Sequence, residues 1–146
     1  MLLDSGPVGE ATHPESEKRG PIREWIFRLL GAGTYLRLPE IVDYEHRRAL
    51  LRRDAFRQVE RLNAFKQVFG HEPLTTEVML TAAELWADVR KRGLPTGTER
   101  ELDVDVILAA QARVLGRSGD RVIVATTNTR HLSRFVDARP WQKIEL

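Results

Sequence analysis

Apolar residues along the chain recur in two patterns, short continuous runs and helical stripes. Leu2 and Leu3 form a short run before Asp4-Ser5-Gly6-Pro7, which is typical of a buried strand that ends in a turn. The polar residues 10–20 predict a loop. The next stripe predicts a helix that Gly31 and Gly33 end, with an inward face of Ile22, Trp25, Ile26, Leu29 and Leu30.

Two more strands and two more helices are predicted in the middle of the chain. Residues 35–38 read as a strand, and Pro39 closes it and opens a helix over roughly 40–53. The stripe over 55–69 predicts another helix, because Gly70 stops it, and residues 73–74 predict a very short strand.

The last part of the chain continues this alternation. Thr75 or Thr76 is expected to cap a helix whose inward face consists of Val78, Ala82, Leu85, Trp86 and Val89. A helix over about 103–115 ends at Gly116, and the apolar run 122–125 predicts a strand buried on both faces. A helical turn near 130–135 and a final strand over 143–146 complete the prediction.

Strands therefore alternate with helices over residues 1–146, without an internal repeat or a low-complexity linker. This order predicts a single domain, a three-layer α/β/α sandwich with a central parallel sheet. In such folds ligands bind beyond the carboxyl ends of the strands.

Composition narrows the function classes. The 146 residues are 42% hydrophobic and 30% charged, and no stretch approaches the roughly 20 apolar residues of a membrane span. No basic segment precedes an apolar run at the N-terminus, so we expect no secretory signal and a cytoplasmic protein. Because the chain contains no cysteine, disulfides, thiol nucleophiles and thiolate zinc sites are excluded. The formal net charge of +2 says little by itself.

Three carboxylates occupy positions where an apolar or neutral residue would suit the fold better. Asp4 directly follows an apolar strand, at its carboxyl end. Glu45 shares a helix face with Ile41, Val42 and Ala49, and Asp105 shares one with Leu108, Ala109 and Ala112. Burying a lone carboxylate is costly, so such a group is normally paired, capped or bound to a metal.

Each carboxylate also has a purely structural explanation. Asp4 can be an Asx-turn residue, and Glu45 can pair with Arg48. Asp105 can lie at a helix N-terminus, where the dipole stabilises it, although Asp103 competes for that capping role.

A shared site would favour a hard cation. Several carboxylates without cysteine point to Mg²⁺ or Mn²⁺, which prefer oxygen ligands and are typical of phosphate chemistry. No Gly-rich phosphate loop followed by Lys-Ser/Thr is present, which argues against a P-loop nucleotidase. Zinc-ligand spacing is absent among the four histidines, His13, His46, His71 and His131.

Four segments, in order and over nearly the whole chain, resemble the motifs of PIN domains. They are Leu2-Leu3-Asp4-Ser5-Gly6-Pro7, Ile41-Val42-Asp43-Tyr44-Glu45, Asp105-Val106-Ile107-Leu108-Ala109-Ala110 and Val124-Ala125-Thr126-Thr127-Asn128-Thr129-Arg130-His131-Leu132. Ser5 replaces the more usual threonine, and Asn128 stands where the all-acid version has a carboxylate.

The resemblance implies a PIN-like fold and a nuclease. Many PIN domains are Mg²⁺- or Mn²⁺-dependent endoribonucleases, including the VapC-type toxins of bacterial toxin–antitoxin pairs. Carried over residue by residue, it implies Asp4, Glu45, Asp105 and Asn128 as the metal ligands and catalytic residues, with Asp103 and Thr126 as secondary candidates. The partners it implies are an RNA substrate, an antitoxin protein and a second copy of the chain in a homodimer, without a membrane.

Other functions remain open. A PIN fold that binds RNA or protein without cutting is kept open by Asn128. A receiver domain would need a lysine late in the sheet, where Lys143 is poorly placed, and the tryptophans of a plain interaction domain are better explained as core. Arg48 and Arg130 are the candidates to hold RNA phosphates.

Overall fold

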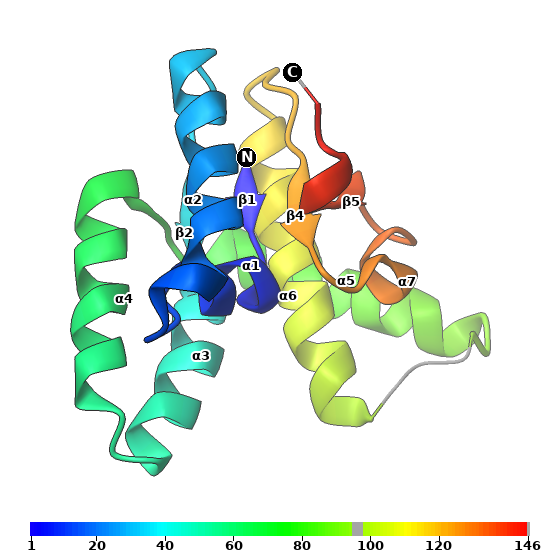
Figure 1. Cartoon of the computed structure of the whole chain (residues 1–146). Helices are drawn as coiled ribbons and strands as arrows, with labels where there is room; N and C mark the ends of the chain where they lie inside the picture. The colour runs from blue at the N-terminus through cyan, green and yellow to red at the C-terminus, as the bar shows by residue number, and fades with distance from the viewer. Residues whose placement is uncertain (95–97, 146) are drawn as a thin grey trace.

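Short parallel strands lie between helices in the structure, a computed structural model that describes residues 1–94 and 98–145 (Figure 1). The strands are β1 (Leu2–Leu3), β2 (Leu38–Pro39), β3 (His71–Glu72), β4 (Val124–Thr126) and β5 (Ala138–Pro140). The helices are α1 (Ser5–Ala11), α2 (Ser16–Gly31), α3 (Glu40–Arg52), α4 (Phe56–Phe69), α5 (Thr76–Lys91), α6 (Glu99–Gly116) and α7 (Thr129–Leu132), with a 3₁₀ turn η1 (Trp141–Lys143).

The strand pairs are parallel, as the alternation of elements predicts. β1, β4 and β5 form one sheet in which Leu3 lies opposite Ala125. β2 and β3 form a second parallel pair, and a bridge between Leu2 and Arg37 joins this pair to β1. The carboxyl ends of all these strands therefore lie at one edge, which is where ligands bind in parallel sheets.

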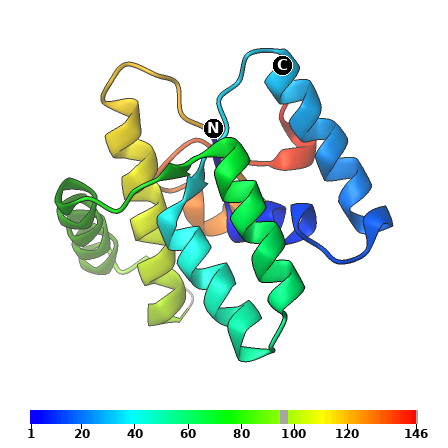
Figure 2. The same cartoon turned by 90° about the vertical axis from the view of Figure 1, so that its left-hand side faces the viewer.

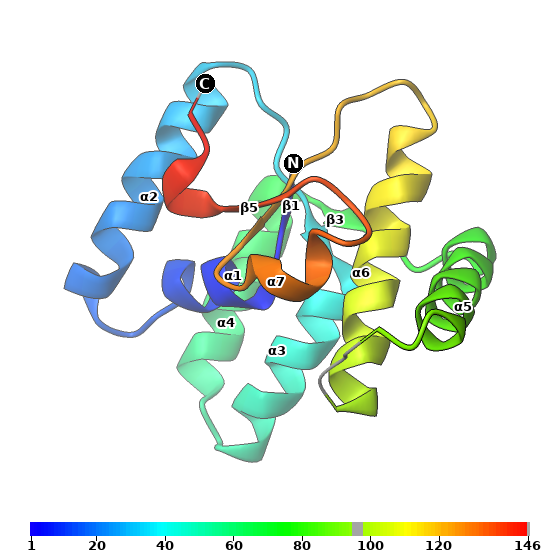
Figure 3. The ribbon, with the colours of Figure 1, turned by 90° about the vertical axis from the view of Figure 1, so that its right-hand side faces the viewer.

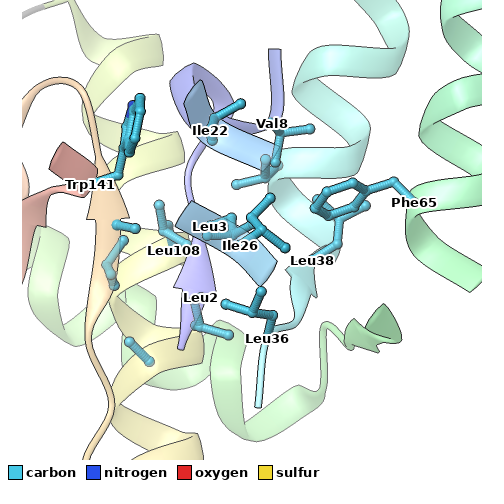
Figure 4. Packing of buried hydrophobic residues seen from close by; sticks show 14 of the residues in the cluster. Leu2, Leu3, Val8, Ile22, Ile26, Leu36, Leu38, Phe65, Leu108 and Trp141 are labelled. Carbon is cyan, nitrogen blue, oxygen red and sulfur yellow. The ribbon is translucent and has the colours of Figure 1, made fainter. Parts of the chain in front are cut away.

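Helices cover both faces of the strands, which confirms the predicted layered α/β class. Figure 3 shows α2 on one side of β1 and β5, and α6 with α5 on the other side. Figure 4 shows Leu3 between Ile26 of α2 and Leu108 of α6, and all three belong to one buried cluster. A second buried cluster joins α5 to α6 through Val78, Ala82, Leu85, Val89, Leu102, Val106, Ala109 and Ala110.

The predicted helices over 40–53 and 55–69 are confirmed as α3 and α4, which form the hairpin at the front of Figure 2. Gly70 ends α4 with a φ of 76°, a backbone conformation that glycine adopts without strain. Thr75 is the N-cap of α5, because its side chain accepts a hydrogen bond from the N–H of Val78. In the part of the chain that the structure describes, no helix has the length and apolar content of a membrane span.

Near the N-terminus, the loop predicted over 10–20 is confined to 12–15, and the rest of that range is helical. The chain already forms α1 at Ser5 and resumes in α2 at Ser16. Asp4 caps α1 by accepting the N–H of Ser5, and Pro7 lies in the first turn, where its missing N–H costs nothing.

Strand positions also differ from the pattern. The strand predicted over 35–38 is an isolated bridge at Arg37 followed by β2, and the one predicted at 73–74 lies two residues earlier, in β3. The final strand predicted over 143–146 is wrong, because β5 pairs with β4 earlier and η1 follows it. Ile144 is buried there without pairing, and position 146 lies outside the described residues.

Two further expectations need correction. Helix α6 begins at Glu99 and not near 103, because Thr98 and Glu101 form a reciprocal capping box. Of the tryptophans expected in the core, Trp25 and Trp141 are buried with ring centroids 5.5 Å apart, whereas Trp86 is 36% exposed on α5.

Candidate metal centre at the carboxyl edge of the sheet

Asp4 lies at the end of β1, and two neighbouring strands fix its position. Its N–H donates to the carbonyl of Ala125 at 2.9 Å, which continues the β1–β4 pairing by one residue. One carboxylate oxygen, Oδ1, accepts the N–H of Ser5 at 2.7 Å, and the other, Oδ2, accepts the hydroxyl of Thr126 at 2.6 Å. The Asx-type capping role is thus real. Oδ1 also accepts the hydroxyl of Ser5 at 3.4 Å, and Oδ2 can accept a second bond, so capping does not exhaust the carboxylate.

Thr126 is the buried last residue of β4 and links Asp4 to the loop that follows. While its hydroxyl donates to Asp4, it accepts the backbone N–H of Asn128 at 2.9 Å. This side chain therefore fixes both a carboxylate and the start of the next turn. The sequence indicates Thr126 only as a secondary candidate; the structure places it in direct contact with Asp4.

Asp105 lies well inside α6, one turn beyond the capping box. Stabilisation by a helix N-terminus acts within the first turn, so the structural explanation offered for this residue does not hold. Burial raises the pKa of Asp105 to about 7, with smaller contributions from the carboxylates of Asp4, Glu45 and Glu101. Burial disfavours the charged carboxylate, and the neighbouring carboxylates add to this effect.

Glu45 approaches this group from α3. Its carboxylate is one of the charges that raise the pKa of Asp105, which places the two side chains in the same part of the molecule. The alternative pairing of Glu45 with Arg48 is not observed among the described residues. Arg48 lies over the ring of Tyr44, 4.8 Å from its centroid, and donates to its hydroxyl at 3.4 Å.

Asn128 and His131 complete the neighbourhood on the last loop and α7. Asn128 is the exposed N-cap residue of α7; its side chain makes no capping bond, and its backbone N–H donates to Thr126. His131 lies one turn later, with Nδ1 3.4 Å from Oδ2 of Asp105. The sequence does not predict a role for His131, because its contact with Asp105 joins α7 to α6 and no spacing within the chain indicates it.

Other candidates lie elsewhere. Asp103 is exposed and lines a surface hollow with Met79 and Trp86 of α5, so α6 carries it away from Asp105. Two residues correspond to about 200° of helix rotation, which explains the separation. Arg130 is exposed on α7.

The donor set of this site suits a hard divalent cation. Mg²⁺ and Mn²⁺ prefer carboxylate oxygens, and the charges that raise the pKa of Asp105 are those that a cation would offset. Among residues 1–94 and 98–145, no group of three acidic or histidine side chains converges closely enough to hold an ion as the side chains lie. The acidic side chains therefore lie in one region without converging on a single point.

Comparisons with known proteins support the fold of the chain and do not extend to its function. No family model matches the chain, and no curated protein matches it either. A solved structure described as VapBC2 from Rickettsia felis bound to a DNA fragment from their promoter contains a similar chain. The TM-score is 0.74, with 14% sequence identity, over 94% of this chain and 96% of that one. The chain therefore shares its mixed α/β architecture with parallel strands with this neighbour.

Proposed function

We propose that this protein is a PIN-domain endoribonuclease that hydrolyses RNA with Mg²⁺ or Mn²⁺. The observation that carries the proposal is the shared electrostatics of the site. Burial and the charges of Asp4 and Glu45 raise the pKa of Asp105, a pattern that structural ion pairs do not explain here. The similarity in fold to a chain of the VapBC2 structure is consistent with it.

The roles of the residues follow from their positions. Asp4, Glu45 and Asp105 would hold the ion, and the amide oxygen of Asn128 would be a fourth, neutral donor. A cation bound there would activate water for in-line attack on a phosphodiester and offset the charge that develops on phosphorus oxygens. Thr126 keeps Asp4 oriented through its 2.6 Å hydrogen bond. Arg130, exposed beside this loop, would contact the RNA backbone.

The test is a cleavage assay on single-stranded RNA with Mn²⁺ and, separately, with chelator. We expect cleavage only with metal, and a loss of at least about 100-fold in Asp4→Asn and Asp105→Asn. Asp103→Asn, an exposed acid two residues away on the same helix, is the matched control and should cut normally. Cleavage that persists in chelator would refute the proposal. RNA binding without cleavage would favour the alternative, a non-catalytic PIN-fold module.

We also propose that the nuclease is the toxin of a toxin–antitoxin pair, cytoplasmic and able to form a homodimer. An apolar groove of about 390 Å³ between α2 and α4 supports a protein partner. Phe27 and Val68 on it are 63% and 72% exposed, and Arg19, Arg23 and Arg61 lie around it. Apolar walls with arginines suit an antitoxin segment that carries apolar and acidic residues.

Expression in a bacterial host tests the toxin role. Growth arrest that Asp105→Asn abolishes is expected, whereas normal growth under strong induction of the wild type would contradict it. Light scattering of the purified chain measures whether it forms the proposed dimer.

A further inference from the structure

A hollow of about 620 Å³ lies next to the site, since Ser5, whose N–H donates to the Asp4 carboxylate, lines it. Two of its lining residues are direct neighbours of proposed metal ligands: Ser5 follows Asp4, and His46 follows Glu45. The hollow then extends to the start of α2 and to the α3–α4 turn, where Lys18, Arg53 and Gln58 line it. We call it the α1–α3 hollow.

The charges of the α1–α3 hollow are opposite in sign to those of the site beside it. Lys18 and Arg53 supply two cations, against one carboxylate from Glu10. Lys18 pairs at 2.9 Å with Glu15, but both side chains are more than half exposed and such surface pairs hold little energy. Arg53 donates from Nε to the carbonyl of Ala49, and no described residue accepts a hydrogen bond from its terminal nitrogens.

Two glycines of α1 line one side of the α1–α3 hollow, and both lie close to side chains of other elements. They are Gly6 and Gly9, three residues apart on the helix, and a Cβ at Gly6 would collide with the side chain of Thr127 in the loop after β4. A Cβ at Gly9 would lie 3.5 Å from Cε1 of His46, which shows how closely α1 approaches α3 at this point. The volume of the hollow, and not the glycines, gives an extended ligand that carries negative charge room beside these polar and cationic groups.

We propose that the α1–α3 hollow binds the nucleotide next to the scissile phosphodiester of single-stranded RNA, with Lys18 and Arg53 contacting its phosphate. This inference rests on the proposed nuclease function. An RNA strand continues past the bond that is cut. Its next phosphate is repelled by the site carboxylates, so it must bind where the protein presents positive charge. The hollow is that region, since it starts beside Asp4 and ends in cations. It differs from the apolar groove between α2 and α4, which suits protein better.

Fluorescence anisotropy with a labelled single-stranded RNA of about 12 nucleotides in chelator tests the inference, because binding is then measured without cleavage. The variant is Lys18→Ala with Arg53→Ala. The control is Lys91→Ala with Arg92→Ala, which removes the same charge from the exposed end of α5. All four side chains are exposed, so thermal unfolding should move little in either double variant.

We expect the Kd of the Lys18/Arg53 variant to rise at least about fivefold over that of the control. The slope of log Kd against log salt should fall by roughly 0.7 for each phosphate that the variant no longer neutralises. Arg53→Lys keeps the charge and should bind nearly as the wild type does. A Kd and slope equal to those of the control would overturn the inference.

Two further measurements separate this inference from the proposed function on which it rests. With Mn²⁺, the double variant should show a raised KM and a kcat within about twofold of the wild type, the opposite of Asp105→Asn. If the wild type cleaves RNA and the variant matches the control, only the inference fails; if the wild type neither binds nor cleaves RNA, the proposed function fails with it. Displacement of the RNA by a poly-glutamate peptide at equal charge concentration would overturn the nucleotide assignment in favour of an acidic protein ligand.

Discussion

Asp105→Asn is expected to make the metal-free protein more stable at neutral pH, although it removes a residue of the proposed active site. Burial, with smaller contributions from Asp4, Glu45 and Glu101, raises the pKa of Asp105 from its ordinary value of 3.8 to about 7. Asparagine keeps the shape of the side chain and cannot ionise. The substitution therefore removes the unfavourable charge and leaves the packing of α6 in place.

The sign and size of the effect follow from linkage. Because the pKa is higher in the folded state, the folded protein binds this proton more tightly, and stability falls as pH rises from about 4 to 7. A pKa raised from 3.8 to about 7 corresponds to at most roughly 4 kcal/mol in the free energy of unfolding. The side chain is 22% exposed, so solvent screens part of this, and we expect about 2 kcal/mol.

Urea denaturation in chelator at about pH 4.5 and about pH 8 measures the difference. At the higher pH, Asp105→Asn should be about 2 kcal/mol more stable than the wild type, and at the lower pH the gain should fall to less than half of that. Asp103→Asn serves as the control, since its exposed side chain should change stability little at either pH. The reasoning is refuted if Asp105→Asn is no more stable than the control at the higher pH, or if its gain is larger at the lower pH.

Three other outcomes are expected. Thr126→Val should destabilise the protein by about 1–3 kcal/mol in urea and slow RNA cleavage, because Asp4 would no longer accept the buried hydroxyl, whereas Thr126→Ser should retain both properties. Burial alone would raise the pKa of Asp43, but the hydrogen bonds from Arg47 and Lys66, both 2.8 Å long, lower it overall. The stability that Asp43 contributes is thus present above about pH 4 and lost below it, and Asp43→Asn should flatten this acid limb in circular dichroism. Gly6→Ala should lower the melting temperature, since its Cβ would lie only 2.2 Å from a side-chain oxygen in the loop after β4.

The sequence pattern predicts the features that a few consecutive residues determine, such as the helices and the order of strands. The alternation of apolar runs with helical stripes predicts parallel strands between helices, because each signal is contained in a few consecutive residues. Asp4 could be placed at a strand end and Glu45 on an inward face for the same reason. Both side chains lie where the pattern puts them, and both influence Asp105.

The remaining features depend on contacts between distant residues. β5 forms where it can pair with β4, so its position at Ala138–Pro140 has no counterpart in a local apolar run. Helix α1 relies on a cap from Asp4 that β1 and β4 hold in place. The approach of His131 to Asp105 joins α7 to α6, and no spacing within the sequence encodes it. The position of Asp103 could have been predicted from the sequence, because two residues on a helix point to different faces, which separates Asp103 from Asp105.

The site couples a rigid edge of the sheet to two carboxylates on helices, so the proposed binding of a metal would also change the stability of the fold. Asp4 is held by the ladder between β1 and β4, whereas Glu45 and Asp105 extend from helices toward it. An ion that binds the folded site alone stabilises the protein by about 2.7 kcal/mol at roughly 100 times its Kd. This is close to the roughly 2 kcal/mol that we expect the ionisation of Asp105 to cost. In saturating Mn²⁺ the wild type should therefore lose little stability between about pH 4.5 and about pH 8, whereas in chelator it should lose about 1–2 kcal/mol. Equal pH dependence in both buffers would show that the ion does not bind at these carboxylates.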